Sequence, residues 1–333
     1  MMQDSLTFSS LIGQDKGKTL LKRSADNRTM AHAYLLRGPN GVGKKRAALT
    51  MAAYMNCRQS AGDVCGRCSS CKKYLAASHP DLLLIQPEGV GIKINQIREL
   101  KQALHFPPFE AKYRVVVLED VHTMRREAAN SLLKTLEEPP PDNILILTAD
   151  EAGELLPTIT SRCQVIPFYA LPYDDVAGAL MAREEMDTET ARTLAAVAEG
   201  SIGRALSLHE NNLLPFRREL IESLIRLSPD EPETIPALFL LAEKAAGLKE
   251  NLHELLELMK SWVRDLILFS VGCPAAIVNQ DLQQNLENAS KRWNLSELFA
   301  KLSLINKAEK KLLRNCNRTL VCEVLFLGFQ IND

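Results

Sequence analysis

A strand, a glycine-rich loop and a helix follow one another between residues 33 and 56, and this succession limits the possible folds more than any other part of the chain. The loop reads GPNGVGKK and fits the pattern G-x-x-x-x-G-K. Glycines in such a loop let backbone N–H groups face phosphate oxygens, and the start of the helix adds positive potential. We expect Lys44 to reach the outer phosphates. A glycine-rich turn that only joins a strand to a helix is the alternative.

The residue after the loop lysine departs from the usual pattern. A Ser or Thr hydroxyl normally ligates Mg²⁺ at this position, whereas this chain has Lys45, and an ammonium group cannot ligate a cation. Binding of ATP or ADP with Mg²⁺ is still possible, but efficient hydrolysis is not expected. The expected phosphate contacts are Gly38, Pro39, Asn40, Gly41, Val42, Gly43, Lys44 and Lys45.

An acidic pair, Glu119-Asp120, ends the apolar run 114–120. Such a pair would hold magnesium and polarise the attacking water. Its order is the reverse of the usual Asp-Glu, so we expect the ATPase activity of this pocket to be weak or absent. A charged strand end in solvent is the alternative interpretation.

Short apolar runs at residues 81–85, 114–120 and 143–148, and one that begins at residue 165, alternate with helical patterns. This alternation predicts a parallel sheet in an α/β domain, with Asn95 as the cap of one helix. After residue 172 the strand signals stop, and leucine-rich helical patterns follow. The expected domains are a nucleotide-binding domain at 1–168, a small helical domain at 169–210 and an all-α domain at 211–333.

The overall charge and hydropathy exclude several classes of protein. Lysine and arginine total 40 and aspartate and glutamate total 41, so a strongly basic nucleic-acid coat is not expected. No apolar run approaches the roughly 18 residues that cross a membrane, and the first residues lack the apolar core of a secretion signal. We therefore expect a cytoplasmic protein without a membrane partner, in which cysteines are thiols or metal ligands.

Four of the eight cysteines follow the spacing C-x7-C-x2-C-x2-C, and these are Cys57, Cys65, Cys68 and Cys71. Zinc prefers four thiolates in a tetrahedron, and the C-x2-C spacing presents two sulfurs to one ion. Because four protein ligands leave no position open to a substrate, we expect a structural Zn²⁺ site. Redox cysteines or chance clustering are the alternatives. We expect the other four cysteines to be small buried residues, namely Cys163, Cys273, Cys316 and Cys322.

Three further segments carry a family resemblance. Residues 130–140 read NSLLKTLEEPP, residues 160–163 read TSRC, and residues 200–204 read GSIGR. In this order, together with the phosphate loop and the inserted cysteines, they closely resemble the subunits of the bacterial DNA polymerase III clamp loader, a pentameric AAA+ assembly. The resemblance covers about residues 5–210. It implies a AAA+ P-loop domain with a zinc insertion, a helical lid and a C-terminal helical collar.

The resemblance also implies roles for single residues. Arg162 matches the family's arginine finger, which reaches the ATP site of a neighbouring subunit and stabilises charge on the transferred phosphoryl group. An arginine at a helix end that pairs locally is the alternative. Arg204 matches the lid arginine that senses nucleotide, and Thr148 matches the polar sensor at the end of the fourth strand.

The implied partners are the gamma/tau and delta subunits of a hetero-pentamer, the sliding clamp and, through the complex, primed DNA. Lys45, the order of Glu119-Asp120 and the SHPD sequence at 78–81 favour a subunit that serves its neighbour in ATP-dependent clamp loading. Such a chain is part of the polymerase holoenzyme without being a polymerase. An ATP-hydrolysing gamma/tau-like motor of the same ring is the second reading. A stand-alone zinc protein that binds nucleic acid is the third, although only Tyr74 and a few cations lie near the cysteines.

Overall fold

The computed structural model describes residues 6–26, 30–59, 62–89, 91–151, 153, 155–184, 186–228 and 230–330. The chain divides into two compact units. The first comprises Met1–Glu185 with Gly200–Gly203, and the second comprises Met186–Glu199 with Arg204–Asp333. The division into three domains at residues 168 and 210 stays a prediction.

A parallel sheet of five strands forms the centre of the first unit, in the order β2-β3-β4-β1-β5. The strands are β1 (Ala33–Arg37), β2 (Leu82–Ile85), β3 (Arg114–Leu118), β4 (Asn143–Ala149) and β5 (Gln164–Pro167). The predicted α/β sheet is thus confirmed. The loop after β1 lies at the carboxyl edge of the sheet, beside the loops after β3 and β4, where proteins of this architecture bind ligands.

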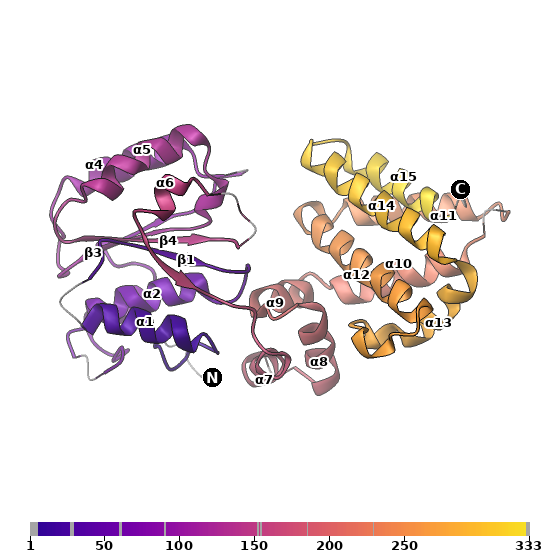
Figure 1. The fold of residues 1–333 in the computed structure, drawn as a ribbon, viewed down its shortest axis with the longest axis horizontal. Coiled ribbons are helices and arrows are strands. Elements are labelled where there is room, and N and C mark those ends of the chain that lie inside the picture. The colour runs from indigo at the N-terminus through magenta and orange to yellow at the C-terminus, as the bar shows by residue number, and fades with distance from the viewer. Residues whose placement is uncertain are drawn as a thin grey trace. The chain divides into compact units, whose positions relative to one another are not determined.

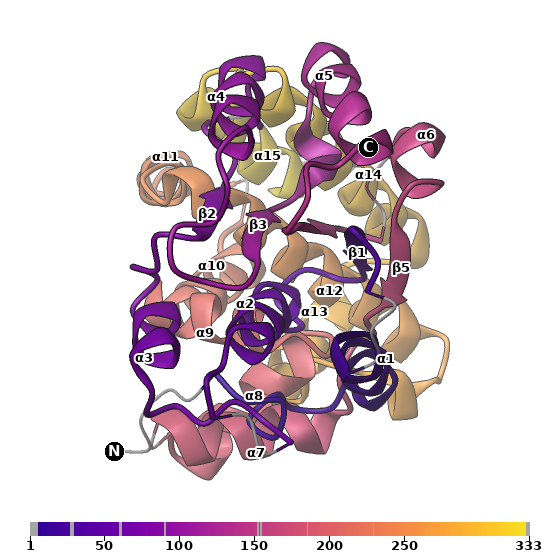
Figure 2. The ribbon, with the colours of Figure 1, turned by 90° about the vertical axis from the view of Figure 1, so that its left-hand side faces the viewer.

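Both faces of this sheet are covered by helices, which explains why its central strands are largely apolar. Figures 1 and 2 show α4 and α5 on one face and α1 and α2 on the other. Along β1, Leu35 joins the core under α4 and α5, whereas Tyr34 and Leu36 join the core under α1 and α2. The helical segments of this unit are α1 (Asp15–Asp26), α2 (Lys44–Met55), α3 (Ser69–Leu75), α4 (Ile94–Leu104), η1 (Val121–Thr123), α5 (Arg126–Glu137), α6 (Pro157–Thr160) and α7 (Tyr173–Glu184).

The predicted cap at Asn95 is wrong, because α4 begins at Ile94. The backbone N–H of Lys93 donates to Oε1 of Gln96 at 2.8 Å. This contact satisfies a backbone donor at the start of the helix, so that α4 begins earlier in the chain than a cap at Asn95 would allow.

The second unit is helical among its described residues, as the leucine-rich pattern predicts. Its core surrounds α12 and includes Leu255, Trp262 and Phe326. Asn294 and Glu297 cap α14 reciprocally, since each backbone N–H donates to the side chain of the other residue. Its helical segments are α8 (Thr188–Val197), α9 (Ile202–Glu210, which begins in the first unit), α10 (Leu213–Arg226), α11 (Thr234–Ala246), η2 (Lys249–Asn251), α12 (Leu252–Ser270), η3 (Pro274–Ala276), η4 (Gln280–Leu282), α13 (Gln283–Arg292), α14 (Leu295–Leu313) and α15 (Arg318–Gln330).

Among the described residues, none of these helices is both long enough and apolar enough to span a bilayer. Cys322 is buried and Cys163 is partly buried, but Cys273 and Cys316 are exposed. The expectation of burial was therefore wrong for the latter two, which lie beyond the ends of α12 and α14, where the chain turns.

Candidate functional site

The glycine loop between β1 and α2 has the backbone that a phosphate site needs. A Cβ on Gly38 would lie 2.2 Å from the carbonyl oxygen of Phe168, so a larger residue does not fit there. Gly41 and Gly43 adopt positive φ angles of 72° and 100°, which glycine tolerates best. Gly43 has no side chain with which to cap α2, so the first N–H groups of the helix are left for another acceptor.

Lys44 is folded onto this loop. Its side chain is buried, and its ammonium group donates to the carbonyl oxygens of Gly38 at 2.5 Å and Pro39 at 2.6 Å. Burial lowers the pKa of Lys44, and the carboxylates of Asp150 and Asp120 oppose this shift. Neutral carbonyl oxygens of the loop thus hold the ammonium group. An anionic phosphate would accept stronger hydrogen bonds from it than these oxygens do.

Lys45 does not extend freely into solvent. Its Nζ lies 2.8 Å from Oε1 of Glu119, immediately beyond β3. The same carboxylate oxygen accepts a hydrogen bond of 3.0 Å from Nε2 of Gln86, which follows β2. The residue that replaces the magnesium-binding hydroxyl therefore neutralises an acid of the predicted magnesium pair. This donor set does not fit a Mg²⁺ ion, because a fixed ammonium group repels a cation.

A hydrogen bond from the backbone of Asp120 to the side chain of Thr148 joins these two residues. The N–H of Asp120 donates to Oγ1 of Thr148 at 3.0 Å, and Asp120 adopts a left-handed backbone with φ 49°. Thr148 is buried near the end of β4. The predicted sensor hydroxyl thus fixes the turn that follows β3.

Arg162 pairs locally. Its guanidinium forms an ion pair with Glu137 at the end of α5 and donates to the carbonyl oxygen of Thr158 at 2.9 Å. The Arg162 side chain is 32% exposed and that of Glu137 is 46% exposed. This local pairing is the arrangement expected from the alternative reading of Arg162, whose side chain is only partly exposed.

Arg204 lies at the start of the second unit's larger segment, whereas the glycine loop belongs to the first unit. Its guanidinium pairs with Glu254 at 2.9 Å and with Glu199 at 3.3 Å, both in the second unit. A role of Arg204 in sensing nucleotide stays a prediction.

The sulfur atoms of the four clustered cysteines all lie within 4.8 Å of one another. The Sγ atoms of Cys65 and Cys71 are 3.8 Å apart, and tetrahedral zinc with bonds of about 2.3 Å separates its sulfurs by about 3.8 Å. Backbone N–H groups of Cys68 and Arg67 lower the pKa of Cys65 to about 6, whereas burial raises the pKa of Cys71. The donor set fits a structural zinc ion that holds the segment between α2 and α3.

The chain after the cysteines is fixed by a buried polar network. His79 stacks on Tyr74 with ring centroids 4.2 Å apart, and its Nδ1 accepts the N–H of Asp81. The Asp81 carboxylate is fully buried and accepts three backbone N–H groups, from Phe109, Glu110 and Ala111. The SHPD sequence therefore anchors the loop between α4 and β3.

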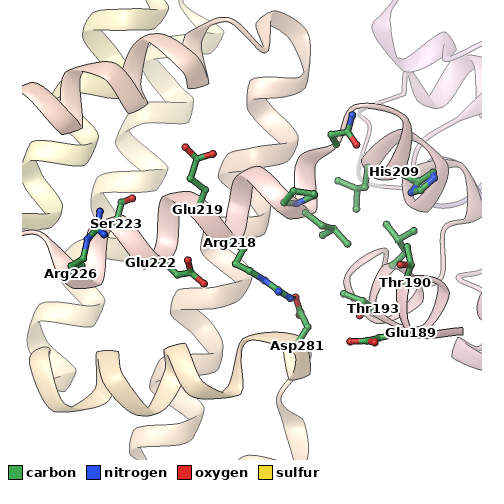
Figure 3. A pocket seen from close by; sticks show the side chains of 15 residues that line it. Glu189, Thr190, Thr193, His209, Arg218, Glu219, Glu222, Ser223, Arg226 and Asp281 are labelled. Atoms are coloured by element: carbon green, nitrogen blue, oxygen red, sulfur yellow. The ribbon is translucent and has the colours of Figure 1, made fainter. Parts of the chain in front are cut away.

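A cavity of about 790 Å³ lies within the second unit, among α8, α9 and α10. Figure 3 shows Arg218 pointing toward Asp281 there, with an N–O distance of 3.5 Å. Glu219, also in its wall, pairs with Lys244. None of the residues singled out from the sequence lines this cavity.

Sequence reasoning missed Gln86 and Glu137. Gln86 directly follows β2, so the rule that parallel strands end at one edge would have placed it near Glu119. Glu137 lies in the quoted LEEPP segment, but its pairing with Arg162 joins residues 25 positions apart, and no local pattern reveals it.

Two family models match the chain. The model described as "DNA polymerase III, delta subunit" matches residues 13–172, and the model described as "DNA polymerase III, delta subunit, C terminal" matches residues 212–330. Together they cover most of both units.

Curated proteins of the same system are similar over nearly the whole chain. "DNA polymerase III subunit delta'" of Pseudomonas aeruginosa is 30% identical over 307 residues, which cover 89% of this chain and 91% of that protein. The protein with this description in Bacillus subtilis is 28% identical over 319 residues, covering 95% and 96%. "DNA polymerase III subunit tau" of Bacillus subtilis is 26% identical and covers 92% of this chain but 58% of its own length.

Proposed function

The chain belongs to the delta-prime (delta') family of DNA polymerase III clamp-loader subunits, which is related to gamma/tau, and we propose that it acts there mainly on a neighbour's nucleotide. In this role it joins gamma/tau and delta subunits in a pentameric ring. It offers Arg162 to an adjacent ATP site and thereby helps ATP-dependent loading of the sliding clamp onto primed DNA.

The ion pair between Lys45 and Glu119 is the observation that carries this proposal. In a motor subunit the corresponding positions supply a hydroxyl and an acid to Mg²⁺. Here they neutralise each other across 2.8 Å. A pocket of this kind does not support efficient hydrolysis, so the contribution of the chain to catalysis lies at a different site.

Arg162 is the group through which that contribution is made. An exposed ion pair is worth about 0–1 kcal/mol, so exchange of Glu137 for a phosphate oxygen costs little. A planar guanidinium binds phosphoryl oxygens well and stays charged at every physiological pH. These properties suit a finger supplied from one subunit to the next.

The remaining parts have supporting roles. The four cysteines hold a structural zinc ion, residues 211–333 form the collar that joins the subunits, and residues 169–210 form the lid. Arg204 matches a lid arginine in sequence and serves mainly to pair with Glu199 and Glu254.

The test is the DNA- and clamp-stimulated ATPase of a reconstituted complex of gamma, delta and this chain. Three versions of the chain are compared: wild type, Arg162→Ala and Lys44→Ala. Loss of an arginine finger lowers turnover at the site that it serves by about 10³-fold or more in related NTPases. We expect a large loss with Arg162→Ala and almost none with Lys44→Ala.

Arg192→Ala, which removes an exposed arginine of α8, controls for a general loss of positive charge. If Lys44→Ala instead removes the larger share of the activity, this subunit is itself a motor of the gamma/tau type. If Arg162→Ala leaves the ATPase rate of the complex unchanged, Arg162 is not an arginine finger.

A further inference from the structure

The magnesium ion that usually accompanies nucleotides in a phosphate loop has no suitable ligands here. The hydroxyl position holds Lys45, and the facing acid, Glu119, has its charge balanced by that lysine and accepts a further hydrogen bond from Gln86. Lys45 on α2, Glu119 after β3 and Gln86 after β2 therefore meet at the carboxyl edge of the sheet. The cation among them is the ammonium group of Lys45.

The parts of the loop that bind phosphate itself are intact. Gly41 and Gly43 keep the positive φ angles that curl the backbone, and Gly43 leaves the start of the twelve-residue helix α2 open to an anion. Lys44 is buried at the mouth of the loop and donates to the carbonyl oxygens of Gly38 and Pro39. An anion that entered the loop would take over these hydrogen bonds as a charged acceptor.

Charge balance connects the two observations. A nucleoside diphosphate or triphosphate carries several negative charges, which Mg²⁺ and the loop lysine normally share. In this chain Lys45, which follows Lys44 in the sequence, adds a second positive charge. Nearly half of its side chain is exposed. Its four-carbon stem lets it turn from Glu119 toward a phosphate oxygen without any change in the backbone.

We infer that this phosphate loop binds a nucleoside diphosphate or triphosphate without a divalent cation, with the Lys45 ammonium group in place of Mg²⁺. The inference rests on the phosphate-loop part of the proposed function and is independent of Arg162. It makes the bound nucleotide a structural ligand of this subunit.

Binding of ADP and of ATP to the full chain, measured by isothermal titration calorimetry in excess EDTA and again in excess MgCl₂, tests this directly. We expect the wild type to bind each nucleotide at least as tightly in EDTA as in MgCl₂, because a nucleotide complexed by Mg²⁺ must release the ion before Lys45 can replace it. Lys45→Thr restores the missing hydroxyl and frees Glu119, so its affinity should become at least about tenfold weaker in EDTA than in MgCl₂.

Lys134→Thr, which removes an exposed lysine of α5, serves as the matched control and should behave as the wild type. Melting temperatures of both variants show that they are folded. Wild-type binding that requires MgCl₂, or no binding of either nucleotide in either buffer, overturns the inference. Neither result affects the Arg162→Ala experiment, since that experiment reads the ATPase of the neighbouring subunits.

Discussion

Arg162 and Glu137 form an ion pair between the end of α5 and the residues that precede β5. Because the carboxylate fixes one nitrogen of the guanidinium, we expect Glu137 to position the finger. Glu137→Gln should lower kcat of the complex's ATPase with little change in KM for ATP, and should have no further effect in the Arg162→Ala background. The free energy of unfolding should change by less than about 1 kcal/mol, since both side chains are partly exposed.

The adjacent substitution, Glu138→Gln, is the control for this prediction. It removes the same charge from the same helix end and should leave kcat unchanged. Equal effects of the two substitutions on kcat would show that only the local charge matters. Glu137→Asp, which keeps the carboxylate, should restore part of the loss.

Asp81 is fully buried in the first unit, and its carboxylate accepts three backbone N–H groups. An amide in its place would turn an N–H group toward these donors. Asp81→Asn should therefore lower the free energy of unfolding by about 2–4 kcal/mol, measured by urea denaturation at pH 7. Asp63→Asn, at a more exposed carboxylate that accepts the N–H groups of Phe8 and Ser9, should have a smaller effect.

The pH dependence of stability gives a second measure of Asp81. Burial alone would raise the pKa of Asp81, but the three N–H donors and Arg114 outweigh it and hold this pKa below its ordinary value. The stabilisation is therefore complete above the unfolded-state pKa of about 3.9 and is lost as the pH falls through the lower folded-state value. Urea titrations between about pH 3 and pH 7 should show a flatter acid limb for Asp81→Asn than for the wild type.

The cysteine cluster predicts one zinc ion per chain by elemental analysis. Cys68→Ser removes a sulfur that caps α3 by accepting the N–H of Cys71. This variant should lose its zinc, and its melting temperature should fall by several degrees, since about 1 kcal/mol corresponds to roughly 2–4 °C in proteins of this size. The exposed Cys316→Ser should keep both the metal and the melting temperature. Full zinc occupancy in Cys68→Ser would contradict a four-sulfur site.

Gly38 offers a test of the close contact beneath the phosphate loop. A Cβ there would meet the Phe168 carbonyl oxygen at 2.2 Å, and this backbone atom cannot move aside independently. Gly38→Ala should lower the free energy of unfolding by about 1–3 kcal/mol and weaken ADP binding. Gly178→Ala, within α7 and with open space around its Cβ, should instead raise stability by about 0.5–1 kcal/mol. Thermal denaturation of the two variants would distinguish them.

The sheet could be predicted from the sequence because its strands are buried on both faces. Strands such as β3 and β4 are largely apolar, and the helices around them repeat apolar residues with helical spacing. The cysteine cluster could be predicted as well, because its four residues are close in sequence and their spacing alone indicates a metal site. Exact helix starts were less predictable, as Asn95 shows, because the contact between Lys93 and Gln96 competes with a local cap.

The chemistry at the carboxyl edge could be predicted only in part. The sequence shows that Lys45 is unsuitable for magnesium and that Glu119 precedes Asp120. It does not show that the two departures meet, because their contact depends on how α2 and β3 are placed. The pairing of Arg162 with Glu137 is hidden for the same reason, since tertiary structure brings together helix ends that are far apart along the chain.

Strand polarity in the sheet has a consequence for reaction kinetics. Residue Gln164 of β5 pairs with Tyr34 of β1 in parallel register, so Arg162 lies before the amino end of these strands and the glycine loop lies beyond their carboxyl end. About six residues of extended backbone separate the two levels, or roughly 20 Å. The chain's Arg162 therefore cannot reach a phosphate held by the chain's own loop. Turnover that uses this arginine therefore requires a second chain in contact with this one, and it should be lost when dilution separates the two chains.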